Sequence, residues 1–292
     1  MNLALAAAAL SGVQVGAAIV ASRLAIGEVS PLTLALLRYA IGLACLLPFA
    51  LRSLPAGTLR AMRPDLPAMA VLGIVQFAGV VALLNYGLQS VGAAQAALIF
   101  SLFPLLTLLM SAALGHDRIT PALLAGVVLS ITGVALSLAP KLGGTGHAGH
   151  WWGELAVLGS AALGAACSVL YRPYLRRHPT LPVSAWAMAA SVAALAVLAL
   201  AEDWPARVPV LSAQAWAVAV FIGVSSGVGY FTWLYALKHE SPTRVTVFLA
   251  LNPVTAAVLG ALLLGESLHA GAWAALGLIG AGLWLATRVE RR

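Results

Sequence analysis

The chain has 292 residues, of which 62% are hydrophobic and 9% charged, and its mean hydropathy is +0.98. Soluble globular domains carry about 25% charged residues, so this composition excludes a protein with a water-facing surface and indicates a polytopic membrane protein. The net charge of +7 does not indicate a nucleic-acid partner, because the basic residues are distributed as membrane topology requires.

Ten apolar segments of roughly 20 residues follow one another along the chain, and each is long enough to cross a bilayer. They lie at 3–25, 31–51, 67–88, 93–114, 120–139, 152–172, 182–201, 213–237, 243–264 and 269–287. We therefore predict an all-α polytopic membrane protein with ten transmembrane helices. Its expected partner is the lipid bilayer in which these helices are embedded.

The basic side chains separate to one side of the membrane when the N-terminus is placed inside. The inner loops then hold twelve of the sixteen Lys and Arg residues, the outer loops hold three, and Arg38 lies within the second segment. An excess of Lys and Arg marks the cytoplasmic side. We therefore predict that both termini are cytoplasmic and that the protein resides in a bacterial-type inner membrane.

A shift of 149 residues superimposes one half of the chain on the other. It places Tyr86 on Tyr235 and Pro104 on Pro253. Each half holds five segments, and this odd number turns the second half upside down, which is typical of alternating-access transporters built from inverted repeats. The predicted organisation is a first repeat at 1–140, a Gly-rich outer linker at 141–150, and an inverted second repeat at 151–292.

Each half also carries one proline well inside its fourth segment, Pro104 in the first half and Pro253 in the second. A proline removes one amide from the helix and frees the carbonyl four residues earlier, which is that of Phe100 or Leu249. In lipid, such a carbonyl needs a neighbouring helix, water or a substrate as its partner. A single proline is usually a tolerated kink, but two at matching positions predict paired hinges or a cavity lining.

Polar side chains recur at helical spacing on three matching pairs of segments, and these pairs are predicted to form the walls of a central cavity. A lone Ser or Thr is more often explained by a hydrogen bond between helices, and Tyr or Trp near a segment end by an interfacial belt. A buried amide is costly without a partner. The candidate substrate-binding residues are Gln14, Gln76, Tyr86, Ser101, Tyr171, Tyr230, Trp233, Tyr235 and Asn252.

Arg38 is the only charged residue deep within a predicted segment. Its guanidinium either extends outward to water or attracts an anionic group such as a substrate carboxylate. No P-loop, H-E-x-x-H motif or metal-spaced Cys/His cluster occurs, so we predict no cofactor, no metal and no enzymatic activity. The fifth and tenth segments are rich in Gly and poor in polar side chains, which predicts packing or dimer helices and leaves a monomer and a homodimer open.

The stretch "YALKHESPTRVTVFLALNPVTAAVLGALLLGESL" at 235–268 resembles the EamA-type repeat of the drug/metabolite transporter superfamily, with its Tyr-Ala-Leu start, central Pro and terminal Gly-Glu. The first copy keeps the Tyr and the Pro but ends in "GHDR" at 115–118, and the family's Trp-containing motif is absent from "GVQVGAAIVASR" in the first segment. The layout is most similar to the bacterial aromatic amino-acid exporters.

This resemblance implies ten helices, cytoplasmic termini and transport of small metabolites. The expected function is export of amino acids, aromatic and others, by alternating access about a midplane cavity. The alternatives are a carrier for other metabolites or drugs, such as sugars or nucleosides, and a non-transport membrane subunit.

Overall fold

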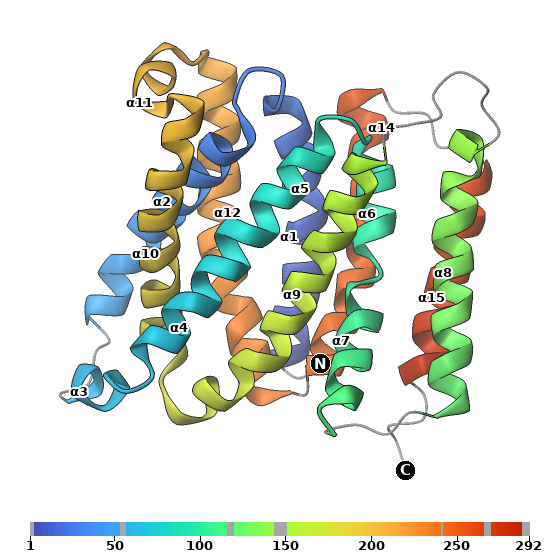
Figure 1. The fold of residues 1–292 in the computed structure, drawn as a ribbon, viewed down its shortest axis with the longest axis horizontal. Coiled ribbons are helices and arrows are strands. Elements are labelled where there is room, and N and C mark those ends of the chain that lie inside the picture. The colour runs from blue at the N-terminus through green and yellow to red at the C-terminus, as the bar shows by residue number, and fades with distance from the viewer. Residues whose placement is uncertain are drawn as a thin grey trace.

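The computed structural model describes residues 3–52, 57–115, 120–142, 151–240, 242–265 and 270–287. Within these ranges every regular element is a helix and no strand occurs. The helices stand side by side as a bundle, and the first residues of α1 lie at the same end of the bundle as the last residues of α15 (Figure 1). The prediction of an all-helical protein is confirmed for the described residues.

The first half of the chain forms the elements up to α8. They are α1 (Leu3–Ala25), α2 (Pro31–Arg52), α3 (Thr58–Met62), α4 (Leu66–Gly73), the π-helix η1 (Ile74–Gly79), α5 (Val80–Leu88), α6 (Ala93–Phe100), α7 (Phe103–Ala113) and α8 (Pro121–Leu142).

The second half forms the remaining elements. They are α9 (Trp152–Arg177), α10 (Thr180–Leu198), η2 (Ala199–Glu202), α11 (Trp204–Arg207), η3 (Val208–Val210), α12 (Ala213–His239), α13 (Pro242–Val247), η4 (Phe248–Ala250), α14 (Leu251–Leu264) and α15 (Ala270–Thr287).

Seven helices of the described chain are long and apolar enough to cross a membrane. They are Leu3–Ala25, Pro31–Arg52, Leu66–Leu88, Ala93–Ala113, Trp152–Arg177, Thr180–Glu202 and Ala213–His239. Three shorter apolar helices, Leu124–Leu136, Leu251–Leu264 and Gly271–Gly282, coincide with the fifth, ninth and tenth predicted segments. The ninth segment is shorter because the 3-10 turn η4 separates α13 from α14.

Contacts between the two halves come in matching pairs. Helix α1 packs against α12 and α14, and α9 packs in the same way against α5 and against α6 and α7. Helix α2 packs against α10 and α12, while α10 packs against α2 and α4. Helices α8 and α15 pack on each other at one edge of the bundle (Figure 1). A continuous apolar core that includes Ile19, Phe77 and Tyr171 joins the two halves.

Helix α1 crosses the interrupted helix α13–η4–α14 almost backbone to backbone. A Cβ atom on Gly12 would overlap the carbonyl oxygen of Phe248, and one on Gly16 would lie 2.5 Å from that of Asn252. Only glycine permits this approach, as small residues do at close helix crossings in membranes. The crossing places the polar face of α1 next to the interruption in the second repeat.

Two carboxylates bridge the halves at the end of the bundle opposite the termini. Glu202 accepts hydrogen bonds from the backbone amides of Leu32 (3.0 Å) and Thr33 (2.7 Å), and thereby caps the start of α2. Glu28 accepts from the amide and hydroxyl of Ser212, the residue before α12. Each carboxylate therefore satisfies helix-terminal donors that belong to the other half.

Candidate functional site

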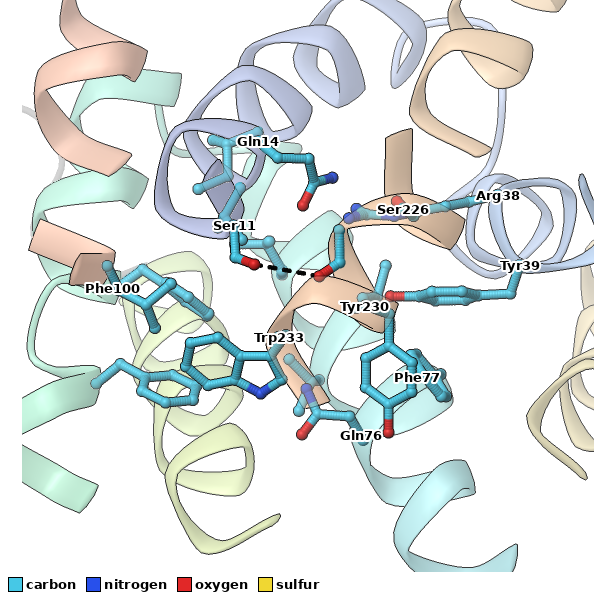
Figure 2. Close-up of a pocket in the computed structure, with 18 residues that line it drawn as sticks. Ser11, Gln14, Arg38, Tyr39, Gln76, Phe77, Phe100, Ser226, Tyr230 and Trp233 are labelled. Atoms are coloured by element: carbon cyan, nitrogen blue, oxygen red, sulfur yellow. Dashed lines mark hydrogen bonds between the residues drawn. The ribbon is translucent and has the colours of Figure 1, made fainter. Parts of the chain in front are cut away.

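A cavity of about 90 Å³ lies inside the bundle, between helices of both halves (Figure 2). Its walls come from α1, α2, η1, α5, α6, α7, η4 and α12. The lining residues are Ser11, Gln14, Val15, Ile19, Arg38, Tyr39, Gln76, Phe77, Val80, Val81, Leu84, Phe100, Phe103, Ser226, Gly229, Tyr230, Trp233 and Leu249.

Polar side chains of α1 join the cavity wall to α12. The Ser11 hydroxyl lies 2.9 Å from the hydroxyl of Thr232 and donates to the carbonyl of Gly229 at 3.2 Å. The Gln14 side-chain amide donates to the Ser225 hydroxyl at 3.4 Å. A Cβ on Gly229 would lie 2.5 Å from the Gln14 amide oxygen, so a glycine at position 229 leaves the space in which the Gln14 amide sits.

Arg38 projects from α2 into the cavity and is only 7% exposed. Its Nε donates to the Ser226 hydroxyl at 2.6 Å, and its guanidinium carbon lies 5.5 Å from the centre of the Tyr39 ring. Arg38 therefore does not extend outward to bulk water, which was one of the two explanations left open by the sequence. No carboxylate pairs with it among the described residues, where Asp65 is the acidic partner of Arg177 and His178.

A close helix crossing sets the position of the Arg38 and Ser226 pair. A Cβ on Gly223 of α12 would lie 2.6 Å from the Ile41 Cβ of α2, and one on Gly227 would lie 2.9 Å from the carbonyl of Gly42. The glycines bring α12 onto α2 and hold Ser226 within hydrogen-bond distance of the guanidinium. The Gly-x-x-x-Gly spacing of 223 and 227 therefore serves a helix contact at the site.

The third predicted segment changes winding where it meets the cavity. Residues Ile74–Gly79 form a π-helix, after which the Val80 amide bonds the carbonyl of Val75, five residues earlier. The neighbouring residues Gln76 and Phe77 lie within this π-helix, and both line the cavity. π-helical turns inside α-helices occur frequently at functional sites.

Aromatic rings form two sides of the cavity. On one side, the Phe77 ring centre lies 4.5 Å from that of Tyr39 and 4.3 Å from that of Tyr230, the latter in an edge-to-face contact. On the other side, Trp233 meets Phe103 edge to face at 6.0 Å. In Figure 2, Gln14 lies at the top of the view and Arg38 enters from the right, while Gln76 and Trp233 lie below. Edge-to-face geometry leaves ring faces free to stack on an apolar or aromatic group.

The two helices that carry the matching prolines, Pro104 and Pro253, are interrupted where they reach the cavity. Helix α6 ends at Phe100 and α7 begins at Phe103, with Pro104 in its first turn. In the second half, η4 ends before α14, whose first turn contains Pro253. Phe100 and Leu249, the residues four positions before each proline, both line the cavity.

Five of the predicted functional residues lie at the cavity. Gln14, Gln76, Tyr230, Trp233 and Arg38 line it, and they come from α1, η1, α12 and α2. Their side chains meet although the residues are far apart in the sequence, because α12 packs on both α1 and α2.

The other five candidate binding residues do not line the cavity. Tyr86 is 43% exposed and donates to Glu202 at 3.3 Å. Ser101 donates to the carbonyl of Leu98. Tyr171 lies behind Tyr230, with ring centres 6.5 Å apart, and Tyr235 packs against Phe231 and His239. Asn252 is fully buried where α14 crosses α1.

Several lining residues were not predicted from the sequence. The polar lining residues outside the predicted set are Ser11 and Ser226. The missed aromatic residues are Tyr39, Phe77, Phe100 and Phe103. The position of Tyr39 in the sequence could have indicated it, because it directly follows Arg38, the charged residue deep within a predicted segment. Phe100 was marked by its place four residues before Pro104, whereas Phe77 and Phe103 have no sequence feature that separates them from core residues.

Comparison with known proteins assigns both halves to one family. Residues 2–139 and 151–288 each match the EamA-like transporter family. Over 98% of each chain, a solved crystal structure superposes with a TM-score of 0.72 at 26% sequence identity.

Related proteins are named as transporters. A probable terminal-alkyne amino-acid exporter of Streptantibioticus cattleyicolor is 31% identical over 214 residues, which are 73% of this chain and 70% of the relative. The aromatic amino acid exporter YddG of Ancylobacter novellus is 32% identical over 202 residues, 68% of each chain. The uncharacterized inner membrane transporter YedA of Escherichia coli is 30% identical over 268 residues, 88% of this chain and 81% of the relative. With both halves matched and seven helices of spanning length, this multi-pass inner-membrane protein belongs to the EamA-like transporter family.

Proposed function

We propose that the protein exports small metabolites, chiefly amino acids with aromatic ones among them, by alternating access of the central cavity. The observation that carries the proposal is the cavity itself, which lies between two halves of related packing and combines amides, aromatic rings and one buried cation. The names of two relatives, an aromatic amino acid exporter and a terminal-alkyne amino-acid exporter, support amino acids as the substrate class.

The proposal places substrate groups against three kinds of side chain. Arg38 contacts the carboxylate, since a guanidinium suits that group in charge and in its forked geometry. Tyr230 and Trp233 hold an apolar or aromatic side chain. Gln14 and Gln76 supply amide oxygens that accept hydrogen bonds from an amino group.

Transport on this proposal requires the cavity to change size. Pockets that hold drug-sized ligands measure roughly 300–1,000 Å³, so the cavity of about 90 Å³ widens when a substrate enters. The interruptions before Pro104 and Pro253 act as the hinges. Because the second interruption packs directly on Gly12 and Gly16 of α1, its movement shifts the wall that carries Gln14.

The proposed topology has ten transmembrane helices in two inverted repeats, 1–140 and 151–292, joined by an outer linker at 141–150, with both termini cytoplasmic. Its support is the gathering of basic residues at one end of the bundle, where the last turns of α2 and α9 and the short helix α3 lie. These residues are Arg52, Arg60, Arg63, Arg176 and Arg177. Single cysteines, in a background without Cys45 and Cys167, test it. Those at positions 57 and 290 should be labelled only from the cytoplasm and one at 145 only from outside; any reversal contradicts the topology.

Counterflow in proteoliposomes tests the function. Vesicles loaded with unlabelled phenylalanine should take up external radiolabelled phenylalanine faster than empty vesicles do, and protein-free vesicles should show no such stimulation. A panel of other amino acids, sugars and nucleosides run in the same format defines the substrate class. Stimulation by sugars or nucleosides alone would favour the alternative carrier, and no stimulation by any amino acid would overturn amino-acid export.

A further inference from the structure

The cavity carries a charge of one sign only. Arg38 lines it, and no carboxylate does so among the described residues. The described carboxylates lie in loops or in the first or last turns of helices: Glu28, Asp65, Glu154, Glu202, Asp203 and Glu240. Within the described structure, a ligand in the cavity therefore meets a fixed positive charge and no fixed negative charge.

The geometry of Arg38 directs its free donors toward a ligand. A guanidinium has five N–H donors, and the Nε donor is occupied by Ser226. The four terminal N–H groups have no acceptor among the described residues, and the residue lines the cavity. A buried cation without a counter-ion is costly. A bound carboxylate would pair with the Arg38 guanidinium and so offset this cost, in addition to satisfying its own charge.

The ammonium group of an amino acid finds no comparable partner. The groups that face it are the neutral Ser11, Gln14 and Gln76 and the rings of Tyr230 and Trp233. These provide hydrogen bonds and a cation–π contact, but they do not offset the like-charge repulsion from Arg38 in a site of low dielectric constant. The ammonium group thus loses its hydration without gaining an ion pair.

We propose that substrate recognition is centred on the carboxylate and that the α-amino group is dispensable, so that the cavity binds monocarboxylates with an apolar or aryl side chain whether or not they carry an amine. This proposal rests on the proposed transport function and names the chemistry that selects its substrates. A carboxylate without the amine binds at least as tightly as the amino acid with the same side chain, and an amine without the carboxylate binds weakly.

Three compounds with one phenyl group separate these contributions. Phenylalanine carries both charges, 3-phenylpropionate only the carboxylate, and phenethylamine only the ammonium. Purified protein in detergent is titrated with each compound by calorimetry at pH 7, which measures binding without transport. We expect 3-phenylpropionate to bind with a dissociation constant equal to or below that of phenylalanine, and phenethylamine at least about tenfold more weakly. Phenethylamine binding as tightly as 3-phenylpropionate would overturn the proposal.

Substitutions test whether the Arg38 guanidinium causes the preference for a carboxylate over an amine. Arg38→Gln should weaken 3-phenylpropionate binding at least about tenfold and remove the preference over phenethylamine, whereas Arg207→Gln, at an exposed arginine outside the cavity, should leave it unchanged. Ser226→Ala keeps the charge but frees Nε, and should weaken carboxylate binding to a smaller extent; it tests the site if Arg38→Gln fails to fold. An unchanged preference in both cavity variants would contradict the role of Arg38.

The experiments distinguish failure of the proposed transport function from failure of carboxylate-centred recognition. If counterflow of every amino acid is absent while 3-phenylpropionate still binds, amino-acid export is wrong and carboxylate-centred recognition stands. If phenylalanine shows counterflow and the phenethylamine titration matches that of 3-phenylpropionate, the transport function stands and the recognition proposal is wrong.

Discussion

Individual side chains decide what the cavity can hold. Trp233 and Tyr230 are each only 7% exposed and contribute rings to opposite aromatic groups, one with Phe103 and one with Phe77. Aromatic pairs contribute about 0.5–1.5 kcal/mol beyond their buried area. These rings therefore serve both the packing of α12 and the apolar surface that a substrate would contact.

Trp233→Ala should raise the half-saturating concentration for phenylalanine counterflow by roughly tenfold or more, because it removes an indole from the aromatic wall. The effect on alanine counterflow should be smaller, since alanine has no ring to stack. Trp233→Phe should recover most of the affinity. The matched control is Trp273→Ala in α15, whose side chain is 56% exposed outside the cavity; equal effects of the two alanine variants would remove Trp233 from the site.

At the scale of elements, the two interrupted helices occupy equivalent places in the two halves. The interruption between α6 and α7 packs near α9, and the interruption at η4 packs on α1. Each lies beside a cavity-lining residue, Phe100 or Leu249. Matching interruptions on both sides of one cavity suit a motion that is repeated in each half.

Pro104→Ala and Pro253→Ala should each lower the counterflow rate severalfold while leaving expression largely intact, because an added backbone amide lets the helix continue and stiffens the interruption. Pro48→Ala provides the control, since Pro48 lies on the exposed side of α2, outside the cavity. Rates equal to the parent in both cavity-side variants would show that these prolines are incidental kinks.

The carboxylate of Glu28, beside the start of α12, makes stability depend on pH. Hydrogen bonds from the Ser212 amide, and then from its hydroxyl, lower the pKa of Glu28 below its ordinary value of 4.5. A group whose folded-state pKa is lowered stabilises the protein above its ordinary value, and this contribution disappears as pH falls through the folded-state pKa. Glu28→Gln should slightly lower the melting temperature in detergent at pH 7, and the difference from the parent should shrink as pH falls below 4.5 and vanish below the folded-state pKa. A pH-independent difference would exclude Glu28 as its source.

For the whole molecule, the placement of titratable groups bears on energy coupling. The described Asp, Glu and His residues lie in loops or in the first or last turns of helices, and none lines the cavity. Carriers driven by protons generally keep an ionisable relay at membrane depth, and histidine is the side chain that titrates most readily near neutral pH. A cavity without such groups fits transport down the gradient of the substrate itself.

We therefore predict phenylalanine counterflow in liposomes without any ion gradient, and little extra accumulation when a pH gradient is imposed. The alternative is a shallow proton site at Glu154, Glu28 or Glu266, of which Glu266 lies outside the described residues. Strong uphill accumulation driven by a pH gradient, and abolished by one Glu→Gln change among these three, would contradict the prediction.

The sequence by itself determined the class of protein, the helical elements and the family. These follow from local patterns: apolar runs of spanning length, the near absence of charges within them, and the paired Tyr and Pro positions. It also singled out Arg38, Gln14, Gln76, Tyr230 and Trp233, because polar or bulky side chains in a lipid-embedded helix need an interior environment. All five line the cavity.

Only the tertiary structure decided which neighbouring residues join them. Ser226 rather than Ser225 meets Arg38 because glycines bring α12 onto α2 at one rotation. Phe77 lines the cavity beside Gln76, within a π-helical turn that the sequence did not predict. A residue's side of a helix depends on winding and on where the backbones touch, and both arise from contacts between segments that are distant in sequence. Hydropathy is an average over a segment. It identifies the helix, but it does not determine how the helix is rotated about its axis or which side chains face the cavity.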